Sequence, residues 1–322
     1  MHTQSCEASR LWLFCPYSTV IKVFSDVPIR QKKGEMMSRV VPPKAIKGSQ
    51  HWLQELVNRS PELLNESLKP RLGLSRNDTI AWLSPQESDD YAEYRDGDVQ
   101  ELLSIRLENR HLHTFWPSGG PQWDALGKTT RGDILLVEAK AHVGELKSTC
   151  KASSPSMTLI QKSLAEAGRS FGAASTNDWS QTYYQYANRL AYLYLLRQLN
   201  GIQAWLVFLY FVNANDVAGP KSEKEWRSAI EDVHAHLGIN RDQLGPFVID
   251  VFLDVTTPYI AQIDTQHLVQ DALGLLQQYK VWVAENPPHG HLKLCSGFPT
   301  TVYAYDSEDA LLLALRPLIK TS

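Results

Sequence analysis

Two acidic residues and a lysine lie close together in this sequence and could support metal-dependent chemistry. Asp124 follows Trp123, and Glu138 and Lys140 follow the apolar run ILLV at 134–137. A buried strand normally ends in a turn, because charges that leave water must be paired. Adjacent carboxylates tolerate each other when a cation lies between them, and such oxygen ligands suit Mg²⁺ or Mn²⁺. These residues are therefore the candidate site.

A β-hairpin is expected to bring the three side chains to one face. Residues 130–132 form the predicted three-residue loop, whose glycine can adopt the left-handed conformation that such loops need. Pairing centred on this loop sets Glu138 opposite Asp124. Lys140 then lies opposite Gln122. Because side chains alternate between the faces of a strand, the two acids and the lysine share one face.

The overall composition is that of a globular α/β protein. The chain has 322 residues, of which 43% are hydrophobic and 21% are charged, and its formal net charge is -3. This length allows one large domain or two ordinary ones, with a sizeable core. The charge counts against a non-specific DNA-binding protein, although a local basic groove remains compatible with it. The four cysteines lack metal-binding spacing, which favours a reduced, cytoplasmic setting.

The N-terminal region raises the question of targeting. Residues 11–24 are apolar, but Glu7, Pro16 and the lack of a small-residue cleavage site argue against a signal peptide. No stretch has the length of a membrane span, so we expect no membrane partner. Met36 and Met37 leave open a later start, with the first ~35 residues a poorly ordered extension.

Apolar periodicity predicts a mixed sheet with flanking helices. We divide the chain into an N-terminal extension (1–40), a helical element (41–90), a core (91–215) and a C-terminal α/β extension (216–322) that could mediate dimerisation. The helices are expected at 49–59, with Ser49 as N-cap, from Pro61 to Leu68, and at 89–109, 178–199, 223–237, 264–278 and 307–320. Besides the hairpin, strands are expected at 80–83, 111–117, 203–212, 247–255 and 280–284.

The order through residue 212 resembles the PD-(D/E)xK nuclease superfamily, whose sequence mark is an acid on the second core strand and acid-x-Lys on the third. Asp124 and Glu138-Ala139-Lys140 match this mark. The resemblance covers roughly residues 91–212 and implies a restriction-endonuclease-like core of helix, three strands, helix and strand. Pro121 lies three residues before Asp124, whereas in the family a proline often stands immediately before this acid.

The resemblance implies metal-dependent hydrolysis of phosphodiester bonds, with DNA as the expected substrate and RNA left open. Asp124, Glu138 and the carbonyl of Ala139 would bind Mg²⁺, with Mn²⁺ as a substitute. The ion would activate a bound water. Lys140 would orient that water or stabilise the transition state.

Many members of the superfamily add a glutamate from the first core helix. On a helical wheel Glu93 lies at the margin of the apolar face, whereas Glu101 points into water, so Glu93 is favoured and Asp96 is held in reserve. Gln122 and Gln185 are weaker candidates for substrate contacts. For Gln185 an ordinary structural or surface-polar role is favoured, and Glu93 could equally be an ordinary surface residue of its helix.

Several simpler interpretations compete with the nuclease. Glu138 and Lys140 could form a solvated ion pair that contributes only ~0–1 kcal/mol. A second acid-x-Lys, Glu145 to Lys147, shows how readily the tripeptide arises, and it lacks a preceding apolar strand. His142 and the histidine pairs 111/113 and 234/236 are interpreted as incidental, because they lack partners at zinc-like offsets. A binding module without hydrolysis, or an interaction protein without a nucleic-acid role, remain the alternative functions.

Overall fold

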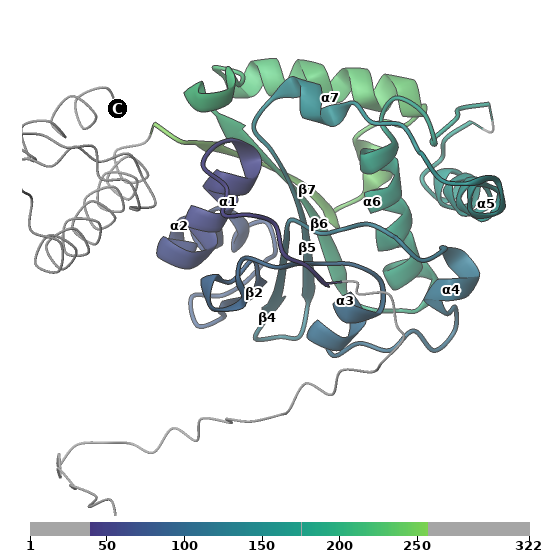
Figure 1. Cartoon of the computed structure of the whole chain (residues 1–322), viewed down its shortest axis with the longest axis horizontal. Helices are drawn as coiled ribbons and strands as arrows, with labels where there is room; N and C mark the ends of the chain where they lie inside the picture. The colour runs from purple at the N-terminus through teal and green to yellow at the C-terminus, as the bar shows by residue number, and fades with distance from the viewer. Residues whose placement is uncertain (1–38, 175, 257–322) are drawn as a thin grey trace, which may run out of the picture. The chain divides into compact units, whose positions relative to one another are not determined.

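A five-stranded mixed sheet forms the centre of the protein (Figure 1). The structure is a computed structural model and describes residues 39–174 and 176–256. The strands lie in the order β2, β4, β5, β6, β7, with the bounds Ile80–Ser84, Ala125–Thr129, Ile134–Lys140, Ala204–Val212 and Val248–Asp254. β2, β4 and β5 pair antiparallel, and β5, β6 and β7 pair parallel. The predicted α/β class with a mixed sheet is confirmed.

Two short helices cover one face of this sheet (Figure 1). They are α1, Gly48–Arg59, and α2, Pro61–Leu68, which starts with a proline that has no N–H to lose at this position. Their leucines recur at helical spacing and are buried against alternate residues of the central strands: Leu53, Leu56, Leu64 and Leu68 against Leu135, Val137, Val207 and Leu209. Both helices agree with the sequence prediction.

Three longer helices cover the opposite face. They are α5, Ser154–Ser170; α6, Tyr184–Tyr194, extended by a π-helical turn at Leu195–Leu199; and α7, Glu223–Leu237. Ser222 caps α7 by accepting a hydrogen bond from the Glu225 amide, and Gly238 ends it in the left-handed conformation. β6 is buried by helices on both faces, as its continuous apolar sequence predicts.

The predicted hairpin register is confirmed. Ala125 pairs with Val137 and Lys128 pairs with Ile134, so Asp124 precedes the first pair of β4 at the level of Glu138. Gly132 has a φ of 88°, the left-handed conformation expected for the loop.

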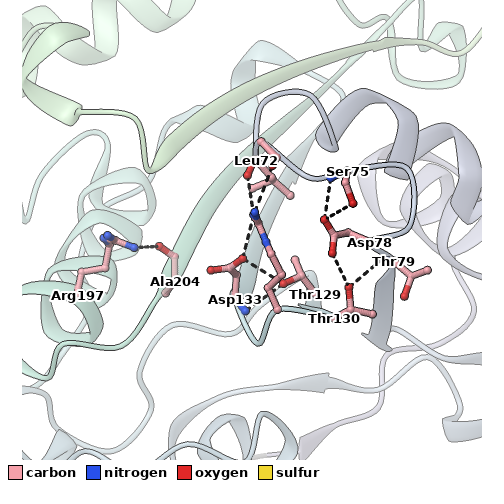
Figure 2. A network of polar contacts seen from close by, with 11 residues as sticks. Leu72, Ser75, Asp78, Thr79, Thr129, Thr130, Asp133, Arg197 and Ala204 are labelled. Atoms are coloured by element: carbon pink, nitrogen blue, oxygen red, sulfur yellow. Dashed lines mark hydrogen bonds and ion pairs between the residues drawn. The ribbon is translucent and has the colours of Figure 1, made fainter.

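Polar contacts hold the turn of this hairpin against the segment before β2 (Figure 2). Asp78 accepts hydrogen bonds from Ser75 and from the Thr130 hydroxyl, and the Thr130 hydroxyl accepts one from the Thr79 amide. Arg131 donates to the Leu72 carbonyl at 2.9 Å. These contacts fix the turn end of the hairpin, which lies opposite the end that carries Asp124 and Lys140.

Two predicted elements between β2 and β4 are wrong. The expected helix at 89–109 is divided into β3, Glu93–Tyr94, and α3, Asp96–Leu102, because the backbone just before β3 is left-handed and β3 pairs with β1, Arg39–Val40. The expected strand at 111–117 is instead the helical turn α4, Leu112–Phe115. The edge of β4 on which it would have paired is taken by β2.

Other differences concern one helix that was not predicted and the starts of two that were. α5 has no counterpart in the prediction, because its serines, proline and glycine weaken the apolar pattern, and α6 starts six residues later than expected. Ser49 is not the N-cap of α1; Lys47 occupies that position, and the Ser49 hydroxyl donates to Glu145. The elements expected at 264–278, 280–284 and 307–320, and the methionines at 36 and 37, lie outside the described residues.

Three of the four predicted segments contribute strands to the five-stranded sheet, whereas β1, from the segment 1–40, pairs with β3 in a separate two-stranded sheet. β2 comes from the segment 41–90, β4 to β6 from 91–215, and β7 from 216–322. Short 3₁₀ turns at Glu87–Asp89, Val143–Leu146, Asn215–Val217 and Asp242–Leu244 connect the larger elements. Within the described ranges, none of the helices has the length and apolar character needed to cross a membrane.

Candidate active site

Glu138 and Lys140 occupy the last positions of β5, on the face that α6 covers. Both are buried, with 2% and 8% of their surface exposed. Lys140 Nζ donates to Glu138 Oε1 at 2.5 Å. Alternation along β5 sets both side chains on the same face, and parallel pairing places Phe208 and Tyr210 of β6 beside them. The ion pair is therefore part of the protein interior and not a solvated surface contact.

Asp124, the residue immediately before β4, lies beside this pair. Its Oδ2 accepts a hydrogen bond of 2.7 Å from the Ala139 amide, which ties the start of β4 to the end of β5. A strand residue directs its N–H and C=O to the same side, so the Ala139 carbonyl faces that side as well. Unlike Glu138, Asp124 is only half-buried. Asp124 is thus the acid of the cluster that solvent reaches.

Arg189 of α6 is a site residue that the sequence analysis missed. Its Nε donates to Glu138 Oε2 at 2.6 Å, and its Nη2 donates to the Gln122 carbonyl at 2.6 Å. Its Nη1 donates to the Asn188 side chain, and its guanidinium lies 4.8 Å from the centre of the Trp123 ring. The sequence carried a signal for this role, because Arg189 is the only charged residue between Asp178 and Arg197.

Glu93 reaches the cluster from β3 and not from a helix, which corrects the predicted position. It is buried, with 7% of its surface exposed. Its two oxygens accept hydrogen bonds from Gln122 at 2.5 Å and from Gln50 at 2.8 Å. Gln50 belongs to α1, a helix in which the sequence indicated no site residue. Gln122 therefore contacts the acid cluster, and α1 contributes a polar side chain to it.

The cluster combines three carboxylates with two cations, and this balance shifts the pKa values of its groups. Burial, reinforced by the negative charge of Glu138, raises the pKa of Asp124 from 3.8 to about 8. Burial also raises the pKa of Glu93, against the hydrogen bonds from Gln122 and Gln50. Burial disfavours the charged form of Glu138 too, but Arg189 and Lys140 together hold its pKa below the ordinary value. Negative charge is thus stabilised at Glu138 and destabilised at Asp124.

Asp124 is the acid of this cluster whose contacts leave it available to a cation. Within the described ranges no group of three or more His, Cys, Asp or Glu side chains is arranged to hold a metal ion, and Glu138 directs its oxygens to Lys140 and Arg189. Among the same residues, however, the Asp124 carboxylate accepts a hydrogen bond from the Ala139 amide alone. A half-buried carboxylate whose charge is disfavoured by burial and by a second acid is a group that a cation stabilises.

Other candidates lie apart from this contact network. Asp96 accepts hydrogen bonds from the Gly119 and Gly120 amides at 2.8 Å each, so it shapes the loop before Pro121. Glu101 is exposed, as expected. The backbone amide of Gln185 donates to Ser148, and its side chain is half-buried one helical turn before Arg189.

The histidines have local structural contacts. His142 is exposed and its Nδ1 accepts from the Gly144 amide, which caps the turn after β5. His234 is buried beside the Tyr186 hydroxyl at 2.8 Å, and burial lowers its pKa to about 4. The rings of His111 and His113 stack on each other. These contacts agree with interpreting the histidines as incidental to the site.

Comparison with known proteins leaves this arrangement to be judged on its own chemistry. No family model, curated protein or solved structure matches the chain. The contacts of Asp124, Glu138, Lys140 and Arg189 are therefore the basis for inferring a function.

Proposed function

We propose that this protein is a Mg²⁺-dependent nuclease that hydrolyses phosphodiester bonds, with DNA as the expected substrate. The observation that carries the proposal is the convergence of Asp124, Glu138 and Lys140 at one end of the hairpin. The Ala139 amide joins the two acids through the hydrogen bond to Asp124, and the ammonium of Lys140 lies against Glu138. Asp124 could bind a metal ion and the buried ammonium of Lys140 could bind an anion, and a metal-bound phosphodiester supplies both.

The order of elements supports the proposal. Apart from α2 and the short elements between β2 and β4, α1 is followed by β2, β4 and β5, then by the two helices α5 and α6, and then by β6. This order resembles the helix, three strands, helix and strand that the resemblance to the PD-(D/E)xK superfamily implies, with two helices in place of the second one. The first helix and first strand of this core are α1 and β2, so the proposed core starts near residue 48 and not at residue 91.

The acids and the lysine of the cluster have distinct roles in the proposed reaction. Asp124, Glu138 and the Ala139 carbonyl would hold the divalent ion, which when bound would neutralise phosphate charge and lower the pKa of a water. Lys140 would direct its ammonium to the negative charge that develops on the phosphate. Glu93 adds negative charge to the site and holds the Gln122 side chain.

Cleavage assays on matched variants test the proposal. Plasmid DNA, single-stranded DNA and RNA are each incubated with Mg²⁺ or Mn²⁺ and the purified protein. We expect metal-dependent cleavage that falls at least ~100-fold in Asp124→Asn and in Lys140→Met, and that EDTA abolishes. Lys147→Met, in the second acid-x-Lys, should cleave as the wild type does. Cleavage that survives both site substitutions would overturn the assignment.

A nucleic-acid-binding module without hydrolysis is the second candidate. The observation in its favour is that both oxygens of Glu138 already have a cationic partner inside the protein, Lys140 on one and Arg189 on the other. Mobility-shift assays distinguish the two functions. A protein that shifts DNA but leaves it intact with Mg²⁺ and with Mn²⁺ is the binding module.

A further inference from the structure

The two cations beside Glu138 are held in different ways. Arg189 is 3% exposed and, besides Glu138, it binds the Gln122 carbonyl, the Asn188 side chain and the face of Trp123. Among the described residues, Lys140 Nζ donates to Glu138 alone. Removing Arg189 from Glu138 would break contacts with several groups at once, whereas removing Lys140 breaks one.

This asymmetry leaves one oxygen of Glu138 for exchange. Oε2 accepts from Arg189, whose guanidinium is fixed by its other partners, so Oε2 stays occupied. Oε1 accepts from Lys140. A metal ion that uses Glu138 as a ligand must therefore take Oε1, which keeps a second lone pair but has the Lys140 ammonium 2.5 Å away, and two cations this close repel each other.

A displaced Lys140 needs a new anionic partner, because a buried ammonium without one is strongly destabilising. After Glu138, the acid that interacts most strongly with Lys140 is Asp124, and the negative charges of both acids raise the pKa of Lys140. Asp124 would itself be engaged by the metal. The remaining anion that the proposed reaction brings to the site is the phosphodiester of the substrate.

We propose that Lys140 is an exchangeable cation that leaves Glu138 Oε1 for a substrate phosphate, so that the divalent ion and the nucleic acid bind cooperatively. This inference rests on the proposed nuclease function and adds a form of regulation to it. The free protein keeps Glu138 neutralised by its own cations and binds metal weakly. A bound phosphodiester takes up the ammonium, opens Oε1 and tightens metal binding. By linkage, the metal tightens nucleic-acid binding by the same factor.

Mn²⁺ titrations test the coupling without relying on cleavage. Binding is followed by the loss of the free Mn²⁺ resonance in electron paramagnetic spectra, with the DNA alone as the blank. The probe is a DNA duplex with charged, cleavage-resistant phosphorothioate linkages, and its control is the same duplex with uncharged methylphosphonate linkages. We expect the charged duplex to tighten Mn²⁺ binding by the wild type about tenfold, within the usual range of coupling between sites. The uncharged duplex should leave it unchanged.

Lys140→Met gives the sharpest result, because it removes the competing cation. We expect this variant to bind Mn²⁺ more tightly than the wild type when no DNA is present, and to gain nothing further from the charged duplex. Lys147→Met is the matched control and should behave as the wild type. Lys140→Gln is measured in parallel, so that one variant with impaired folding, detected by thermal melting, does not decide the outcome.

The outcomes separate the inference from the function beneath it. Equal Mn²⁺ affinity with and without the charged duplex, or an unchanged or weaker affinity in both Lys140 variants, overturns the coupling and leaves the nuclease standing. No Mn²⁺ uptake by the wild type or the variants under any condition overturns the proposed function and the coupling with it.

Discussion

The chain contains the same pattern, acid-x-Lys, in two environments only a few residues apart. Glu138 and Lys140 lie at the buried end of β5, where Glu138 is 2% exposed. Glu145 and Lys147 lie in the 3₁₀ turn that follows and just after it, where Lys147 is exposed and Glu145 accepts a hydrogen bond from Ser49. In the first pair, both charged groups are largely removed from water.

The two pairs differ in burial and not in sequence pattern, so burial is what makes the first pair a candidate for chemistry. An exposed ion pair gains little because water screens it, whereas buried charges depend wholly on the partners that the fold supplies. At Glu138 those partners are Lys140 and Arg189.

Removing the buried acid should destabilise the protein far more than removing the exposed one. Glu138→Ala leaves Lys140 and Arg189 without their shared carboxylate, so we expect a loss of about 3–5 kcal/mol in the free energy of unfolding. Glu145→Ala should cost about 1 kcal/mol or less. Urea unfolding of both variants measures the difference. Equal losses would show that burial does not determine how much these two acids contribute to stability.

Two arginine–glutamate ion pairs with the same N–O distance, one buried and one exposed, allow the same contrast. Arg189 lies 2.5 Å from Glu138 in the interior, and Arg227 lies 2.5 Å from Glu223 on the exposed side of α7. Arg189→Lys keeps the charge but removes the planar guanidinium whose Nε and Nη2 bind Glu138 and the Gln122 carbonyl, so we expect a loss of about 1–3 kcal/mol in the free energy of unfolding.

Arg227→Lys is the control for this substitution. It should change the free energy of unfolding by less than about 0.5 kcal/mol, because the pair is solvated and screened. Repeating both measurements in high salt tests the explanation. Salt should weaken the small contribution of the Arg227 pair and leave the Arg189 pair nearly unchanged.

Asp124 should make stability depend on pH in an unusual direction. Burial and the charge of Glu138 raise its pKa from 3.8 to about 8, so the folded protein holds a proton that the unfolded chain has released. The contribution of Asp124 to the free energy of unfolding therefore falls as the pH rises from about 4 to about 8. Asp124→Asn cannot ionise, and we expect it to melt about 2–4 °C above the wild type at pH 9.

Thermal melting at several pH values measures this effect. The difference between the two proteins should shrink toward pH 5, where the wild-type Asp124 carboxyl is protonated. A variant that melts below the wild type at pH 9 would mean that the Asp124 charge is stabilised in the folded protein. The destabilised acid that supports the proposed metal site would then be absent.

The smallest effect concerns the exposed tripeptide. Ser49→Ala removes the hydrogen bond of 2.8 Å between the Ser49 hydroxyl and Glu145, which links α1 to the turn after β5. We expect a loss of about 0.5–1 kcal/mol in the free energy of unfolding, and no change in cleavage or Mn²⁺ binding. A clear loss of Mn²⁺ affinity would instead make the second acid-x-Lys part of the site.

Much of the scaffold could be predicted because its signals are local. The glycine of the hairpin loop and the apolar run of β5 are enough to place Asp124 at the level of Glu138, and the structure has this register. Glu93 could not be placed in the same way. Its apolar neighbours fit a helical wheel, but the backbone turns left-handed at Asp90 and Tyr91, and β3 pairs with β1 some fifty residues earlier.

The sequence by itself determined the α/β class, the register of the hairpin and the identity of the acids and the lysine at its open end. These features follow from side-chain alternation and turn geometry, which act over a few residues. Only the tertiary structure decided that Arg189 and Gln50 reach the same cluster, from α6 and α1. The reason is that a buried charge is satisfied by whichever polar group the packing of distant helices brings to it, and no local pattern records that choice.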